Sequence, residues 1–367
     1  MKLLFLSRLE MKDVIIIGGG LSGLTAAYIL KKNSFTVQVL EANNYLGGRI
    51  KTAITDTNMA LEMGATWIFN DPNLKSLLFE LGLILYPQFA SGKALYEVKA
   101  AQKPQIFDAN QMTGGQIYHK VIGGTSQIIT SLSNYVDLEN IELNTVVVKV
   151  EDKDEYIKIT TKDEKIFEAR NVITALPPRL LESTINFLPE LPSKSNLIRQ
   201  KTHTWMADSV KFSLEYKQPF WREKGYAGLA ISNVGLVREI QDHVNGENNA
   251  YGLVGFMSLR ADQFNMTKEQ RKEIVISDMI RLFGNDAAAV INYEDTIWSM
   301  EQFISSGFKV NQGIYAHQNN GNKEIVVPQF QDKLYFIGAE TSSSNPGYME
   351  GAVRTAKEIV RKIIQKK

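Results

Sequence analysis

The stretch Val14-Ile15-Ile16-Ile17-Gly18-Gly19-Gly20-Leu21-Ser22-Gly23 (residues 14–23) decides the fold of this chain. Its first four residues are an apolar, β-branched run, which is typical of a strand buried on both faces of a parallel sheet. The glycines that follow fit a dinucleotide-binding turn. Gly18 allows the tight turn, Gly20 lets the backbone approach a pyrophosphate, and Gly23 lets a helix pack closely on the strand. Residues 24–32 predict that helix, whose first N–H groups attract phosphate oxygens.

A second predicted strand, residues 36–40, ends on Glu41. The distance from Gly23 to Glu41 is close to the spacing of about 20 residues at which a carboxylate binds ribose hydroxyls. The strand, turn, helix and acid together predict a nucleotide-binding domain. The alternative is a tight turn followed by a solvated glutamate, but it would not explain three glycines where one would close the turn.

The composition is that of a globular protein. The chain has 367 residues, of which 44% are apolar and 22% are charged, and at roughly 150 residues per domain this length predicts two to three domains. The 41 basic and 40 acidic side chains give a net charge of +1, which provides no reason to expect nucleic acid or an anionic membrane as partner. The absence of cysteine excludes disulfides and thiolate metal sites, and the four histidines are too scattered to predict a metal site.

The two ends of the chain carry no clear targeting signal. No apolar run approaches the ~20 residues of a membrane span. Residues 1–10 begin like a signal peptide, but Arg8 and Glu10 interrupt the apolar stretch. Because Met11 directly precedes the first predicted strand, we expect residues 1–10 to be a disordered tail or an extension from an upstream start. We therefore expect a cytoplasmic protein without membrane contact.

Further motifs indicate which nucleotide is bound. After Glu41 come Leu46-Gly47-Gly48-Arg49 and Glu62-Met63-Gly64-Ala65-Thr66-Trp67. Near the C-terminus, residues 333–337 predict a strand, followed by Gly338-Ala339-Glu340-Thr341 and by Pro346-Gly347-Tyr348-Met349-Glu350-Gly351-Ala352-Val353, which opens a final helix. With these motifs at both ends, the sequence resembles the flavin-containing amine oxidases of the monoamine oxidase type. The alternative for Gly47, Gly48 and Arg49 is a plain loop with a surface charge.

The resemblance implies an α/β fold, with a doubly wound, Rossmann-like FAD-binding domain and a mixed-sheet substrate domain. It assigns residues 11–85, 113–198 and 308–367 to the FAD-binding domain. Residues 86–112 and 199–307 would form a reduced substrate domain. The stretch from Leu85 to Gly114 is short where the family usually inserts a helical subdomain over the substrate tunnel. The site is therefore expected to be open or to be closed by a second chain in a homodimer.

The resemblance also implies the cofactor, FAD, which must be free of a cysteinyl link because the chain has no cysteine. The residues that match the family's FAD-binding motifs are Gly18, Gly20, Ser22, Gly23, Glu41, Ala42, Gly48, Arg49, Gly64, Ala65, Thr66, Trp67, Val147, Gly338, Glu340, Tyr348 and Met349. Asn43 stands where relatives usually carry arginine. This difference predicts FAD binding that is weaker by on the order of 1 kcal/mol, for a lost charge-assisted contact.

Four residues match positions that carry the family's chemistry. Lys211, before Pro219-Phe220-Trp221, matches the lysine that holds a water against flavin N5. Tyr348 and Phe308 match the two walls of an aromatic cage that aligns the amine, and Trp298 matches a further signature. The alternatives are a solvent-exposed strand lysine and ordinary core aromatics.

The implied activity is oxidation of an amine by hydride transfer to flavin N5, with an imine, its carbonyl hydrolysis product and hydrogen peroxide as products. Molecular oxygen would then be the electron acceptor. Two alternatives stay open: a related flavin desaturase or dehydrogenase with another acceptor, and a flavin-binding scaffold that has lost catalysis. The sequence does not name the amine, because no carboxylate or arginine can be placed in the pocket.

Overall fold

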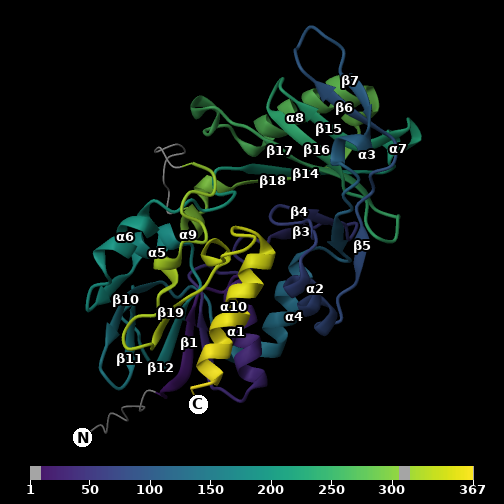
Figure 1. Cartoon of the computed structure of the whole chain (residues 1–367). Helices are drawn as coiled ribbons and strands as arrows, with labels where there is room; N and C mark the ends of the chain where they lie inside the picture. The colour runs from purple at the N-terminus through teal and green to yellow at the C-terminus, as the bar shows by residue number, and fades with distance from the viewer. Residues whose placement is uncertain (1–9, 306–314, 367) are drawn as a thin grey trace, which may run out of the picture.

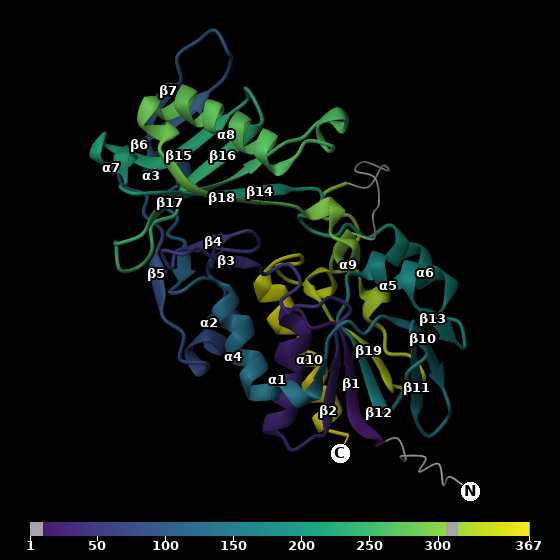
Figure 2. The same ribbon diagram turned by 180° about the vertical axis from the view of Figure 1, so that it is seen from behind.

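The computed structural model describes residues 10–305 and 315–366. Two large β-sheets dominate the molecule, one in the lower and one in the upper half of Figure 1. The N-terminus of the described chain and the C-terminus both lie at the lower end of the larger sheet (Figures 1 and 2).

The larger sheet has eight strands. Its parallel part consists of β19 (Leu334–Phe336), β12 (Ile166–Thr174), β1 (Lys12–Ile17), β2 (Val37–Leu40) and β9 (Ile141–Glu142). The remaining strands are β10 (Val147–Asp152), β11 (Ile157–Thr161) and β13 (Asn186–Leu188). β11 pairs antiparallel with both β10 and β12.

The predicted first strand lies in the middle of this sheet, as its unbroken apolar run requires. Val14 and Ile16 face α1 (Leu21–Lys32) and α10 (Met349–Ile364), which lie side by side on one face (Figure 1). Ile15 and Ile17 face the opposite side, where they pack with residues of β10, β11 and α5 (Pro178–Thr184). Burial on both faces is the reason that the strand has no polar residue after Asp13.

The second sheet has seven strands and is mixed, because β15 and β6 pair in parallel and the other pairs are antiparallel. In spatial order the strands are β18 (Val290–Ile297), β14 (Val210–Tyr216), β17 (Tyr251–Met257), β16 (Val237–Asp242), β15 (Tyr226–Ser232), β6 (Lys93–Glu97) and β7 (Gln105–Asp108).

The two faces of the second sheet have different neighbours. Phe212 and Leu214 share a hydrophobic core with residues of α8 (Lys268–Phe283), which covers the face that is uppermost in Figure 1. Because side chains alternate along a strand, Lys211 and Ser213 point to the other face. That face meets the hairpin of β3 (Thr52–Ile54) and β4 (Ala60–Glu62).

The other helices and strands are short connections around the two sheets. They are α2 (Pro72–Glu80), β5 (Leu85–Pro87), α3 (Ala109–Thr113), β8 (His119–Val121), α4 (Ser126–Val136), α6 (Ser193–Gln200), α7 (Phe220–Glu223) and α9 (Gln302–Ser305), together with 3-10 turns at Leu138–Asn140, Ala261–Gln263, Asn285–Ala288, Trp298–Met300, Lys323–Val326 and Ala339–Thr341. From Leu85 to Gly114, all of which is described, the single helix is α3, with five residues.

The structure confirms the α/β fold and adjusts several element boundaries. The first helix begins at Leu21 rather than Leu24, directly after Gly20. β12 is one continuous strand, whose first half pairs with β11 and whose second half pairs with β1. The membership of the two sheets supports the predicted two-domain division, which stays a prediction. Among the described residues, no helix has the length and apolar character needed to cross a bilayer.

Candidate active site

A cavity of about 590 Å³ lies between the two sheets. The carboxyl ends of β1 and β2 line it on one side, and β14, β16 and β17 line it on the other. Of the predicted site residues within the described chain, all except Gly23 line this cavity. Phe308 lies outside the described residues. The structure therefore brings together motifs from both ends of the sequence and from the second sheet.

The glycine turn after β1 has the geometry that its three functions require. Gly18 has φ +110°, and a Cβ on Gly23 would lie 2.0 Å from the Gly18 carbonyl oxygen. Gly23 therefore lies behind the turn and permits the close contact of α1 with β1. A Cβ on Gly20, in contrast, would find within 4 Å only the Gly47 oxygen, at 3.9 Å. The space beside Gly20 is open to the cavity, as a close approach of a ligand requires.

Glu41 is held at the end of β2 by the glycine turn. Its Oε2 accepts a hydrogen bond of 2.7 Å from the Gly19 amide, and its Oε1 accepts one of 2.8 Å from the Asn43 amide. The side chain is buried, and burial raises its pKa although the two amides favour the charged form. The carboxylate thus lines the cavity at the position where a ribose-binding acid was predicted.

Arg49 and Glu340 form a bidentate ion pair in the cavity wall. The Nη1–Oε1 and Nη2–Oε2 distances are 2.5 and 2.8 Å, and Glu340 is fully buried. The same two groups bind the backbone of Trp205: its amide donates to Glu340 Oε1 at 3.0 Å, and its carbonyl accepts from Arg49 Nη1 at 2.9 Å. Arg49 and Glu340 were both predicted as cofactor-binding residues, from motifs at opposite ends of the chain; in the protein the guanidinium of Arg49 is the counter-ion of Glu340.

Lys211 is the buried cation of the cavity. Its side chain is 2% exposed, and its Nζ donates to the Gly64 carbonyl at 2.5 Å and to Thr66 Oγ1. The Nζ also lies 4.7 Å from the ring centre of Trp67. Burial lowers the pKa of Lys211 to about 7, although the carboxylates of Glu62 and Glu239 act in the opposite direction. The alternative of a solvent-exposed strand lysine is therefore wrong.

Tyr348 stands at the start of α10 as part of an aromatic wall. Its ring lies 5.5 Å from that of Trp205 and 6.2 Å from that of Phe69, and both of these residues also line the cavity. Trp205 stacks on His317 at 4.0 Å. Sequence reasoning did not find Trp205, because its segment carries no motif and meets Tyr348 only in the folded chain.

Trp298 lines the cavity and also has a structural contact. It is 3% exposed, and its Nε1 donates to the Met63 carbonyl at 3.0 Å. Trp298 therefore lines the cavity and also packs between the two sheets. The interpretation as a site residue and the interpretation as a core aromatic do not exclude each other.

Three cavity residues of the second sheet were missed: Arg238, Glu239 and Phe256. Phe256 pairs with Lys211 across β17 and β14, and Glu239 pairs with Phe256 across β16 and β17. No local sequence signal could have found them, because the strand register alone places them beside Lys211. Among the described residues no cluster of three or more metal-ligating side chains occurs.

Comparison with known proteins identifies the family. A family model described as flavin containing amine oxidoreductase matches residues 85–364, and one described as an NAD(P)-binding Rossmann-like domain matches residues 16–81. The chain belongs to the flavin-containing amine oxidoreductase family. It is an FAD-dependent amine oxidoreductase.

Curated relatives of this family align with almost the whole chain. Flavin-containing amine oxidase A from Canis lupus familiaris is 25% identical over 460 positions, covering 97% of this chain and 85% of the relative. Flavin-containing amine oxidase B from Homo sapiens is 24% identical and covers 96% of this chain and 86% of the relative. The alignments are longer than the 367 residues of this chain, because the relatives carry segments that it lacks.

Solved structures show the same fold at lower identity. Putrescine oxidase bound to putrescine superposes with a TM-score of 0.81 at 23% identity, over 97% of this chain and 99% of that chain. Cyclohexylamine oxidase from Brevibacterium oxydans gives a TM-score of 0.83 at 20% identity, with the same coverage.

The cavity fits the FAD that this family uses. The open space beside Gly20, the N-terminus of α1 and the buried carboxylate of Glu41 form a dinucleotide cradle at one end. Gly64 lets the backbone pass close to Arg49, since a Cβ there would lie 2.1 Å from the Arg49 carbonyl oxygen. Lys211 and Tyr348 line the part of the cavity next to the second sheet and α10.

Proposed function

We propose that the protein oxidises an amine at the carbon next to nitrogen. The substrate loses a hydride from this carbon and a proton from nitrogen, and water hydrolyses the resulting imine to a carbonyl compound and free amine or ammonia. Gly20, Glu41 and Arg49 would help to hold FAD without a covalent link, and the bound FAD would supply the hydride acceptor and the two-electron reduction of oxygen to hydrogen peroxide. The observation that supports this reaction most is the buried Lys211 in the wall of a cavity lined by the cofactor motifs.

The Nζ of Lys211 would hold a water molecule and would accept or donate a proton. Because its pKa is about 7, the group exchanges a proton readily at neutral pH, as an acid–base residue must. The Gly64 carbonyl and Thr66 hydroxyl fix its position. A decayed flavin-binding scaffold would have no physical reason to keep a buried lysine here, because burial of a cation destabilises the fold.

The aromatic wall would orient the substrate. Tyr348 lines the cavity at the N-terminus of α10, and the rings of Trp205 and Phe69 lie 5.5 and 6.2 Å from its ring. A protonated amine is attracted to such faces before it loses its proton. Trp298 and Phe308 are proposed to complete this wall.

The oligomeric state of the protein in solution is a separate proposal. The absence of a long helix between Leu85 and Gly114 supports a site that is open or covered by a second copy, and sedimentation equilibrium of the FAD-loaded protein tests the homodimer. Cytoplasmic localisation stays a prediction of the sequence.

The decisive experiment is the visible spectrum of FAD-reconstituted protein under anaerobic conditions, before and after addition of butylamine, putrescine, benzylamine and an L-amino acid. Bleaching of the flavin band by an amine, with hydrogen peroxide formed on readmission of oxygen, is the expected result. A flavin that no amine bleaches would favour a desaturase or a scaffold. A protein that binds no flavin after reconstitution would contradict the proposal.

A further inference from the structure

The wall of the cavity opposite the cofactor motifs contains a row of three residues from adjacent strands. Lys211 of β14 is paired with Phe256 of β17, and Phe256 is paired with Glu239 of β16. Paired residues on neighbouring strands point to the same face, and strands are spaced by about 4.8 Å, so the backbones of Lys211 and Glu239 are about 10 Å apart. The Lys211 Nζ lies 5.6 Å from the Phe256 ring centre. An apolar ring therefore separates a cation from a carboxylate along one wall.

Among residues 10–305 and 315–366, the carboxylate of Glu239 makes a hydrogen bond but no direct ion pair. Its Oε1 accepts a hydrogen bond of 2.7 Å from Gln241 Nε2, which is neutral. Within residues 10–305 and 315–366, no lysine, arginine or histidine nitrogen lies within ion-pair distance of it. The side chain is half-buried and lines a cavity whose walls are mainly apolar. A ligand cation beside this carboxylate would make the direct ion pair that these described residues do not supply.

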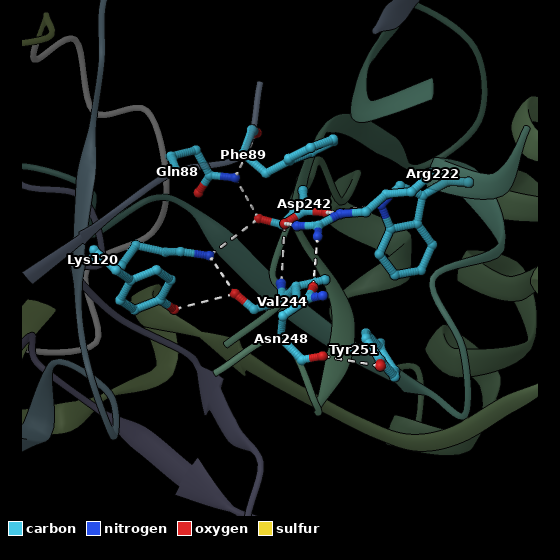
Figure 3. Close-up of polar contacts among 10 residues, drawn as sticks. Gln88, Phe89, Lys120, Arg222, Asp242, Val244, Asn248 and Tyr251 are labelled. Atoms are coloured by element: carbon cyan, nitrogen blue, oxygen red, sulfur yellow. Dashed lines mark hydrogen bonds and ion pairs between the residues drawn. The ribbon is translucent and has the colours of Figure 1, made fainter. Parts of the chain in front are cut away.

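The strand that carries Glu239 is firmly anchored. Its last residue, Asp242, accepts hydrogen bonds from Arg222 Nε at 2.7 Å, from Arg222 Nη2 at 2.8 Å and from Trp221 Nε1 at 2.9 Å, and Figure 3 shows this cluster. Gln88 donates to the Asp242 carbonyl at 2.7 Å and accepts from Nε1 of Trp67, which lines the cavity, at 3.1 Å. The position of Glu239 relative to the cavity is therefore preorganised rather than set by a mobile loop.

We propose that Glu239 is an ammonium-binding subsite, which gives the enzyme a preference for amines that carry a second positive charge, such as diamines and polyamines. The proposal rests on the proposed function and names its substrate class. One amino group is oxidised at the end of the cavity that holds Lys211 and Tyr348. The second, protonated and not reacting, binds the Glu239 carboxylate, and the alkyl chain between them passes the ring of Phe256.

The neighbouring Arg238 provides the competing interpretation. A register shift between Val237 and Glu239 places Arg238 in a bulge, so that it lines the cavity as well. An arginine would select a substrate carboxylate instead. The strand pairing favours Glu239, because it places this residue in one row with Phe256 and Lys211, whereas Arg238 lies in the bulge.

The test compares putrescine with butylamine, which differ only in the second amino group. For the FAD-loaded wild type, Glu239→Gln and Arg238→Gln, anaerobic flavin reduction yields a Kd for each amine, and calorimetric titration measures amine binding independently of turnover. Glutamine matches glutamate in shape and can still accept the hydrogen bond from Gln241, so the variant is expected to fold. Glu273→Gln, an exposed position on α8, is the matched control.

We expect wild type and Glu273→Gln to bind putrescine more tightly than butylamine. Glu239→Gln should reduce this preference by about 10- to 100-fold, the usual contribution of one charged hydrogen bond. An unchanged preference in Glu239→Gln would overturn the proposal, as would tighter binding of 4-aminobutyrate than of putrescine that is lost in Arg238→Gln. If no amine bleaches the wild-type flavin, the proposed function fails, and the calorimetric comparison still decides whether Glu239 binds an ammonium group.

Discussion

Burial of Lys211 destabilises the fold but gives the site an acid–base group. The lysine replaces water around its amino group with two oxygen acceptors and the face of Trp67. These contacts do not restore the hydration of a full cation, so burial lowers its pKa to about 7. A group that titrates near neutral pH in a cavity wall has the properties of an acid–base residue.

The rate at which oxygen reoxidises the enzyme should depend on the charge of Lys211. We expect the reaction of the reduced enzyme with oxygen to slow as pH rises through about 7, because the ammonium form stabilises the negative charge that develops on oxygen. Lys211→Met should slow this step by about 100-fold at pH 6 and remove its pH dependence. Stopped-flow reoxidation measures both effects. Unchanged reduction and reoxidation rates would exclude Lys211 from the mechanism.

The free energy of unfolding should change with pH as Lys211 titrates. The pKa in the folded protein is about 7, and about 10.4 is expected in the unfolded chain. Between these values the unfolded chain binds more protons, so stability rises with pH and the cost of burial is largest below about 7. We expect wild-type apoprotein to gain stability relative to Lys211→Met as pH increases from about 7 to about 10. Urea denaturation at several pH values checks this, and a constant difference would mean that the pKa is not lowered.

At the scale of elements, the turn between β1 and α1 contains two glycines with different functions. Gly23 is needed for packing of the helix on the strand, and Gly20 is needed for ligand binding. A Cβ on Gly23 would lie 2.0 Å from the Gly18 oxygen, whereas one on Gly20 would enter open space. The two positions therefore act on different properties, although both belong to one motif.

The matched pair Gly23→Ala and Gly20→Ala should separate these properties. We expect Gly23→Ala to lower the free energy of unfolding by about 3 kcal/mol, because the helix must move off the strand. Gly20→Ala should stay within about 1 kcal/mol of wild type but weaken FAD binding by about tenfold or more, because its methyl group would occupy the ligand's space. Urea denaturation of the apoprotein and fluorescence titration with FAD measure the two effects. Equal destabilisation by both substitutions would contradict this division.

At the scale of the whole molecule, three successive backbone carbonyls join the two halves. Ser213 Oγ donates to the Glu62 oxygen at 3.0 Å, Trp298 Nε1 to the Met63 oxygen at 3.0 Å, and Lys211 Nζ to the Gly64 oxygen at 2.5 Å. All three donors come from the second sheet or from the turn that follows β18. The cavity therefore lies at a junction that is itself hydrogen-bonded and buried.

This junction predicts that the two halves unfold together. We expect a single thermal transition, and FAD at a free concentration of 100 times its Kd should raise the free energy of unfolding by about 2.7 kcal/mol. Trp298→Phe should lower it by about 1–3 kcal/mol, because the Met63 carbonyl loses its donor in a buried place. Calorimetry with and without FAD tests this. Two separate transitions, of which FAD shifts only one, would show that the halves are independent.

The sequence by itself determined the nucleotide-binding half of this protein. A buried strand, three glycines, a helix and Glu41 follow one another within a few tens of residues, so local sequence reports directly on local geometry. The resemblance to a family then supplied the cofactor and the two residues Lys211 and Tyr348, and the structure places both residues in the cavity wall.

Only the tertiary structure decided which further residues face that cavity. Arg49 meets Glu340 from the far end of the chain, and both side chains bind the backbone of Trp205 in the cavity wall. Glu239 reaches the wall near Lys211 only because β17 lies between β14 and β16 in a fixed register. A shift of one residue in any of these strands would turn its side chains to the opposite face. Register depends on the packing of the whole sheet, and no short stretch of sequence records it.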